Sequence, residues 1–94
     1  MTYTVAKITT PDGVQFTARQ DSRTPKEVVA QGIAKVVHEG VKGGVYESLY
    51  NHKTCTVDTM KTGLTEAQAK ALKKAYIMVY RTEGHNVLNS TRND

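Results

Sequence analysis

The sequence predicts a small α+β fold in a single domain, in which a sheet made of an N-terminal β-hairpin and a third strand packs with helices. Three observations predict it. The length of 94 residues suits one domain. Strand-like alternation precedes helix-like periodicity, and turn or capping residues separate the elements. The expected order is β-β-α-(α)-β-α, with an ordered core over about residues 3–89 and a frayed tail over 90–94.

The first expected element is the hairpin. Side chains alternate between two faces over residues 3–9 and again over 14–19. Between these runs stand Pro11, Asp12 and Gly13. Proline presets φ, aspartate can bond its own backbone and glycine accepts a positive φ, so the stretch favours a tight turn. Two alternating runs joined by such a turn predict a pair of antiparallel strands.

The next expected element is a helix that begins at a capping box. The Thr24 hydroxyl can accept from an amide of the first turn, while Glu27 reaches back to the cap amide. Apolar residues then recur at helical spacing until Gly40, where the helix is expected to end. Residues 45–50 fit a short helix without requiring one, which is why the second helix stands in parentheses in the expected order.

A third strand and a last helix complete the predicted fold. Residues 54–60 are rich in β-branched side chains and predict a strand at an edge of the sheet. Thr65 and Gln68 form a second capping box, and Gly84 is a natural stop for the helix that follows. The apolar residues expected to face inward on this helix are Leu72, Ala75, Tyr76 and Val79.

Composition limits the class of protein. With 38% hydrophobic and 23% charged residues, the chain has the balance of a globular domain rather than a disordered one. Its net charge of +4 favours an anionic partner. No apolar run approaches the roughly 18 residues of a membrane span, so no membrane partner is expected. A single cysteine, Cys55, and no visible signal peptide indicate a cytoplasmic location.

Three stretches carry a resemblance to a known family. AKITTPDGVQFTA forms the expected hairpin, LTEAQAKALKKAYI lies in the last helix, and GHNVLN follows it. Together they resemble the hairpin, the metal-site helix and the terminal asparagine motif of the GIY-YIG nuclease domain. The resemblance covers nearly the whole chain, from about Tyr3 to Asn89. It implies a GIY-YIG-like domain over residues 1–94.

The resemblance also implies that the catalytic residues have been lost. The family's two catalytic tyrosines fall on Ala6 and Phe16, and its metal-binding glutamate falls on Lys73. A phenyl ring cannot take a proton from water, and a lysine cannot ligate Mg²⁺, which needs oxygen donors. We therefore expect no enzymatic activity, no catalytic residue and no cofactor.

Positively charged residues form the candidate binding site. In the resemblance, the family's catalytic arginine falls near Lys26, or on Arg23 if the register shifts, and its asparagine falls on Asn86. The residues expected to contact nucleic-acid phosphates or another anion are Arg19, Arg23, Lys26, Lys70, Lys73, Lys74, His85 and Asn86. The leading hypothesis is a catalytically inactive domain that binds nucleic acid through this basic face, more weakly as salt rises.

Two other functions fit the same sequence. One is a small inhibitor or adaptor of the phage type, such as an anti-defence factor in the host-cell cytoplasm, that binds a protein. Tyr46 and Tyr50 are the candidate partner interface, for another protein or for a homo-oligomer, since tyrosine is enriched at interfaces. The other is capture of an anionic nucleotide. No metal site is expected, because the three histidines and Cys55 match no compact zinc pattern.

Overall fold

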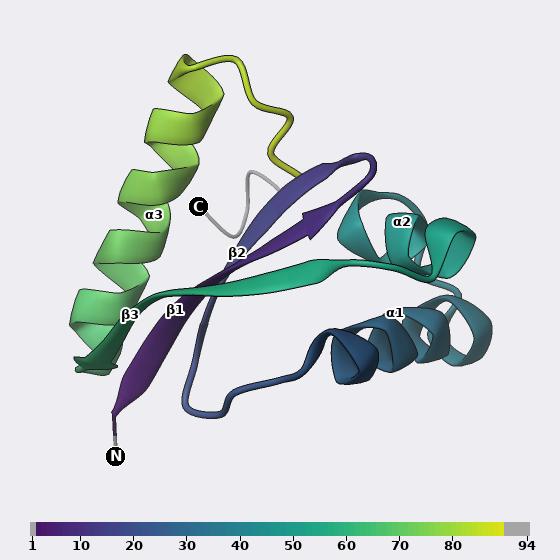
Figure 1. Cartoon of the computed structure of the whole chain (residues 1–94), viewed down its shortest axis with the longest axis horizontal. Helices are drawn as coiled ribbons and strands as arrows, with labels where there is room; N and C mark the ends of the chain where they lie inside the picture. Colours follow the sequence, from purple (N-terminus) through teal and green to yellow (C-terminus); the bar gives the residue numbers. More distant parts are fainter. Residues whose placement is uncertain (1, 90–94) are drawn as a thin grey trace.

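The computed structural model describes residues 2–89, which form the predicted α+β fold (Figure 1). The elements are β1 (Tyr3–Thr10), β2 (Gly13–Arg19), α1 (Pro25–Glu39), α2 (Gly44–His52), β3 (Thr56–Leu64) and α3 (Glu66–Thr82). The three strands form an antiparallel sheet in the order β2-β1-β3. The segment that the sequence left open is therefore a helix, α2. The tail predicted to be frayed, 90–94, lies outside the described residues.

The hairpin has the predicted turn. Strands β1 and β2 pair without a register shift as far as Thr10, which lies opposite Gly13. The Thr10 hydroxyl donates to the Gly13 carbonyl oxygen at 3.1 Å. A Cβ atom at Gly13 would lie 2.2 Å from the carbonyl oxygen of Asn86, so only glycine fits where the C-terminal segment crosses the hairpin.

Both predicted capping boxes are present. The Thr24 Oγ1 accepts from the Glu27 N–H at 3.2 Å, and the Thr24 N–H donates to Glu27 Oε1 at 3.0 Å. Thr65 and Gln68 make the same reciprocal pair at the start of α3. Helix α1 ends at Gly40, whose φ of 67° is left-handed. Because these bonds are local, the sequence located the helix ends closely.

Strand β3 is an edge strand, as predicted, but it is longer than the predicted 54–60. It begins at Thr56 and continues to Leu64, where it pairs with Tyr3. The pairing shifts register on either side of Val5. The shifts fall where β3 contains Lys61 and Gly63, which are weak strand formers and gave no strand signal.

The sheet separates two small hydrophobic cores. The core on the α1 and α2 side consists of Ile8, Val28, Val45 and Leu49. The core on the α3 side consists of Val14, Phe16 and Ile77, with Tyr76 and Tyr80 packed against it. The Phe16 ring stacks on Tyr76 with 5.3 Å between centroids and meets Tyr80 edge-on at 4.9 Å. Phe16 thus fixes the position of α3 against β2.

The face that helix α3 turns to the sheet matches the predicted one only in part. Tyr76 and Leu72 are half-buried, but Ala75 is exposed and the Val79 side chain is 51% exposed. The fully buried residues are Ala69 and Ile77. Apolar residues occupy nearly every position from 75 to 80, so their spacing alone could not identify the inward face.

The segment after α3 returns to the free edge of β2, where Figure 1 shows it beside the hairpin. The Val14 N–H donates to the Asn86 carbonyl oxygen at 2.9 Å, and the Leu88 N–H donates to the Val14 carbonyl oxygen at 2.7 Å. Val14 also forms an isolated parallel bridge with Val87. Residues 86–89 therefore cover part of an edge that would otherwise be open.

Candidate functional site

A cavity of about 200 Å³ lies at the free edge of β2. It is bordered by the sheet, all three helices and the C-terminal segment. The polar residues that line it are Gln15, Thr17, Arg19, Arg23, Gln31, Tyr46, Lys73 and Asn89. Three of the eight residues predicted from the sequence to bind an anion, namely Arg19, Arg23 and Lys73, are therefore brought together here.

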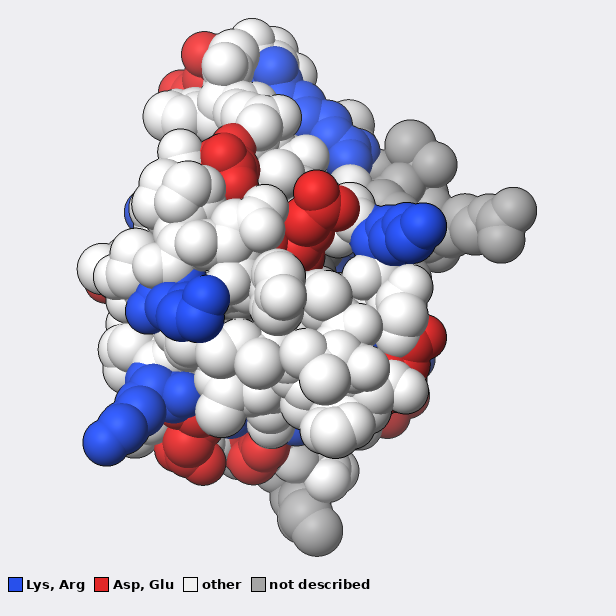
Figure 2. All heavy atoms as spheres, turned by 90° about the vertical axis from the view of Figure 1, so that its right-hand side faces the viewer, with Lys and Arg blue, Asp and Glu red and all other residues white. Residues whose placement is uncertain are grey.

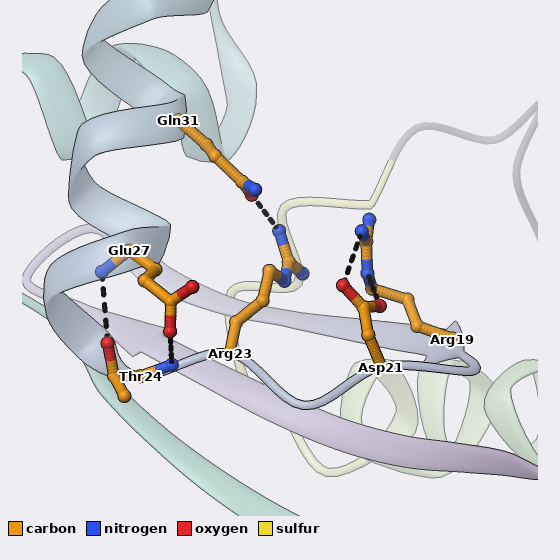
Figure 3. Close-up of polar contacts among 6 residues, drawn as sticks. All are labelled: Arg19, Asp21, Arg23, Thr24, Glu27 and Gln31. Carbon is orange, nitrogen blue, oxygen red and sulfur yellow. Dashed lines mark hydrogen bonds and ion pairs between the residues drawn. The ribbon is translucent and has the colours of Figure 1, made fainter.

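The two arginines come from the connection between β2 and α1. Figure 3 shows their guanidinium groups extending to the same side of this connection. Arg19 forms a two-pronged ion pair with Asp21, in which Nε lies 2.7 Å from Oδ1 and Nη2 lies 3.2 Å from Oδ2. Arg23 donates from Nη1 to Oε1 of Gln31, on the second turn of α1. The capping box that starts at Thr24 holds this end of the loop.

Arg23 is partly buried without an ion pair among residues 2–89. Partial burial lowers the pKa of its guanidinium, and the positive charge of Arg19 lowers it further. The hydrogen bond from its Nη1 goes to the neutral amide of Gln31. By contrast, the hydrogen bond from Arg19 lowers the pKa of Asp21. Asp21 therefore forms an ion pair with Arg19, whereas it offsets the charge of Arg23 only from a distance.

Lys73 completes the positive group from the opposite side of the sheet edge. It is half-buried on α3 and lines the cavity. Its two neighbours in the predicted basic face do not line it. Lys70 pairs with Glu66, with 3.2 Å between Nζ and Oε1, and Lys74 is exposed. Lys26, in the first turn of α1, is exposed and outside the cavity lining as well.

His85 and Asn86 have structural contacts away from the cavity lining. The Asn86 side chain donates to the carbonyl oxygen of Asp12, which ties the C-terminal segment to the hairpin turn. The His85 ring lies against Tyr80, with 4.8 Å between ring centroids. Neither residue is among those that border the cavity.

Asn89 is a site residue that was not predicted from the sequence. It is 6% exposed and lines the cavity while bonding to the backbone of Phe16. Gln31 and Tyr46 also line the cavity, and Gln31 was not predicted either. The signal that would have identified Asn89 is its burial, which depends on a contact between positions 73 residues apart.

The two predicted interface tyrosines have different surroundings on α2. Tyr46 is half-buried, packs against the core and lines the cavity, with the Lys35 Nζ 6.0 Å from its ring centroid. Tyr50 is 39% exposed, with the Lys53 Nζ 5.3 Å from its ring centroid. The structure thus places only Tyr50 on the open surface.

Charges are dispersed over the end of the molecule formed by α1 and α2. Figure 2 shows this face, on which lysine and arginine side chains alternate with acidic ones and with wide neutral areas. No broad patch of positive charge is visible on it. A ligand that needs several cations together would find them in the cavity rather than across this face.

The remaining candidate groups do not form a reactive cluster. Cys55 is half-buried, and burial raises the pKa of its thiol. His52 lies 3.2 Å from Asp12, between Nε2 and Oδ2. Within residues 2–89, no group of three or more histidine, cysteine, aspartate or glutamate side chains is arranged to hold a metal ion.

Three comparisons with known proteins, namely with protein-family models, with curated proteins and with solved structures, found no match to this chain. Among the helices described, none has the length and apolar character needed to cross a membrane. The chain is thus defined as a small α+β domain with a three-stranded antiparallel sheet and a cationic cavity at its edge.

Proposed function

We propose that the protein is a catalytically inactive, GIY-YIG-like domain that binds nucleic-acid phosphates in the cavity beside β2. The observation that carries this proposal is the environment of Arg23. Its guanidinium is half-buried, bonds a neutral amide, and shares the cavity with Arg19 and Lys73. Of these three cations, Arg19 alone forms an ion pair with a carboxylate among residues 2–89, and such a group of positive charges favours an anionic ligand.

The absence of nuclease activity is proposed from two residues that border this cavity. Phe16 and Lys73 occupy the positions that correspond, in the resemblance, to a catalytic tyrosine and the metal-binding glutamate, and both contribute to the lining. A phenyl ring accepts no proton, and an ammonium group repels Mg²⁺. Cleavage of DNA or RNA in the presence of Mg²⁺ or Mn²⁺, lost in Lys73→Ala, would contradict this part of the proposal.

The position of the cations predicts how binding depends on salt. Two or three phosphate contacts, as Arg19, Arg23 and Lys73 could make, release few counterions. We expect log Kd for a single strand to change with log salt with a slope of about 2. A much steeper slope would indicate a larger basic surface than the cavity provides.

The test is a fluorescence-anisotropy titration with a labelled single-stranded oligonucleotide, for the wild type and matched variants. Lys73→Gln and Arg23→Gln are expected to weaken binding by about tenfold or more, because each removes a charge-assisted hydrogen bond. Lys74→Gln is the matched control, since it removes the same charge from the next position, which is exposed. Equal losses for Lys73→Gln and Lys74→Gln would contradict a role for the cavity.

A second candidate function, binding of a protein partner, is favoured by the outer face of α3. Met78 is 66% exposed and Val79 is 51% exposed, and Ala71 and Ala75 are exposed beside them. Contiguous exposed apolar side chains are typical of protein contacts. A complex that survives nuclease treatment and is lost in Val79→Glu, but not in Arg23→Gln, would favour this function, including an inhibitor or adaptor role.

We also propose a cytoplasmic location. Its support is the single cysteine, Cys55, which the chain cannot use for an internal disulfide and which is half-buried. Fractionation of cells that produce the protein tests the location directly, because recovery in a membrane or secreted fraction would contradict it.

A further inference from the structure

We infer that the cavity receives a phosphate monoester, the dianionic group found at the end of a nucleotide chain or on a free nucleotide, rather than an internal phosphodiester. This inference rests on the proposed function and names the chemical class of ligand for the same site. Three properties of the cavity carry it: its size, its local charge and its hydrogen-bond donors.

The size of the cavity suits one small group. Its volume of about 200 Å³ is below the roughly 300–1,000 Å³ of pockets that enclose a drug-sized ligand. A phosphate with part of a sugar fits such a space, whereas a segment of double helix does not. To place its phosphate there, an internal phosphodiester would have to fit a nucleotide on each side at the open mouth of the cavity. A chain end brings only one.

The local charge matches a dianion. Arg19, Arg23 and Lys73 contribute three positive charges to the cavity, and Asp21 cancels one of them through its ion pair with Arg19. In the neighbouring cavity beyond Tyr46, the Lys35 ammonium is already paired with a glutamate. The cavity therefore has a net positive charge of two, from three cations and one carboxylate. A phosphate monoester carries about −1.5 to −2 at neutral pH, whereas a phosphodiester carries about −1.

The donors that remain are also sufficient for a monoester. Arg23 donates from Nη1 to Gln31, and its Nε and Nη2 form no hydrogen bond within residues 2–89. Arg19 keeps Nη1 after its two contacts with Asp21. Lys73 adds an ammonium from the α3 side. A monoester presents three terminal oxygens, and each of the three cations can donate to one of them.

The experiment compares ligands that differ only at the phosphate. Single-stranded DNA oligonucleotides of one sequence carry a 5′-phosphate, a 3′-phosphate or hydroxyl ends, with the fluorophore at the opposite end. Adenosine 5′-monophosphate and inorganic phosphate serve as competitors. At least one phosphorylated end is expected to bind about tenfold more tightly than the hydroxyl end. This preference should disappear in Arg23→Gln and persist in Lys74→Gln.

The outcomes separate this inference from the proposed function. Equal binding of phosphorylated and unphosphorylated oligonucleotides, reduced in both cases by Arg23→Gln, overturns the monoester inference and leaves nucleic-acid binding in place. Binding of adenosine 5′-monophosphate without binding of any oligonucleotide supports the monoester inference and overturns the nucleic-acid function in favour of nucleotide capture. Binding of neither overturns both. The ligands are compared on the wild-type protein, so a failure of Arg23→Gln to fold does not affect this comparison.

Discussion

The side-chain amide of Asn89 bonds both backbone groups of Phe16. Its Oδ1 accepts from the Phe16 N–H and its Nδ2 donates to the Phe16 carbonyl oxygen, each at 2.9 Å. A neighbouring strand would satisfy the same two groups, so the amide takes the place of a strand at this point on the edge of β2. Because Phe16 also anchors Tyr76 and Tyr80, this contact joins the C-terminal segment to the packing of α3.

Replacing Asn89 by alanine is expected to destabilise the fold by about 2–4 kcal/mol, because two buried backbone groups lose their partners. Urea unfolding of Asn89→Ala and wild type measures this change. Asn86→Ala is the matched control, since that exposed side chain makes one bond, to the Asp12 carbonyl oxygen. Its cost should be about 1 kcal/mol. Equal costs for the two variants would contradict a special role for Asn89.

The contact between Gly32 and Leu49 gives a second prediction. A Cβ atom at Gly32 would lie 2.6 Å from Leu49 Cβ, where α1 crosses α2. Alanine improves helix propensity by about 1 kcal/mol. Inserting a methyl group into this well-packed contact is expected to cost about 1–3 kcal/mol, which outweighs that gain. Thermal unfolding should therefore show Gly32→Ala to be destabilised. Ala30→Gly, at an exposed position of the same helix, tests the propensity effect alone.

The elements were predictable where their signals are local. The boxes at Thr24 and Thr65 and the turn at Gly13 depend on residues within four positions, and the structure has each of them. The face of α3 was predictable only in part, because apolar residues surround this helix: Tyr76 packs against the core with Phe16, as expected, whereas Ala75 and Val79 are exposed. The periodicity of apolar residues does not identify the buried face of this helix, which is set by long-range contacts.

The candidate site divides in the same way. Arg19 and Arg23 are close in sequence, so their presence at one site was predictable from the short loop between β2 and α1. Lys73 was expected there from the resemblance. Gln31 and Asn89 were not, because their place in the cavity follows from how α1 and the C-terminal segment pack around the edge of β2. Neither packing arrangement can be recognised from a pattern of neighbouring residues in the sequence.

The contact between Tyr3 and Glu66 predicts how stability depends on pH. The Tyr3 hydroxyl donates to Oε2 of Glu66 at 2.5 Å. This bond raises the pKa of Tyr3 and, together with the charge of Lys70, lowers the pKa of Glu66. A depressed carboxyl pKa stabilises the fold above the unfolded-state value and loses this effect as pH falls through the folded value. A raised tyrosine pKa stabilises the fold below about pH 10 and loses this effect as pH rises through the folded value.

Tyr3→Phe is therefore expected to flatten the stability profile at both ends. Unfolding midpoints measured from acidic to strongly alkaline pH should fall less for this variant than for the wild type. The contact is exposed, so the differences will be small and are best seen at low salt. Tyr50→Phe is the control, because no described side chain bonds the Tyr50 hydroxyl. A profile unchanged by Tyr3→Phe would show that the contact does not contribute.

The ion pair between Arg19 and Asp21 gives the last prediction. Asp21→Asn removes the carboxylate that cancels one charge of the cavity and leaves one acceptor oxygen where two accept from Arg19. Phosphate binding should tighten by a few-fold, about the effect of one partly exposed charge. Asp58→Asn raises the net charge by the same amount from an exposed position on β3, so it serves as the control in the same titration.

Comparison of these two variants shows which property of the molecule governs binding. If Asp21→Asn tightens binding and Asp58→Asn does not, the local charge beside Arg23 governs affinity, as the monoester inference requires. Equal tightening would attribute the effect to net charge, which acts at a distance and is screened by salt. Weaker binding in Asp21→Asn would contradict the prediction in another way, because it would mean that the carboxylate holds the Arg19 guanidinium in its binding orientation.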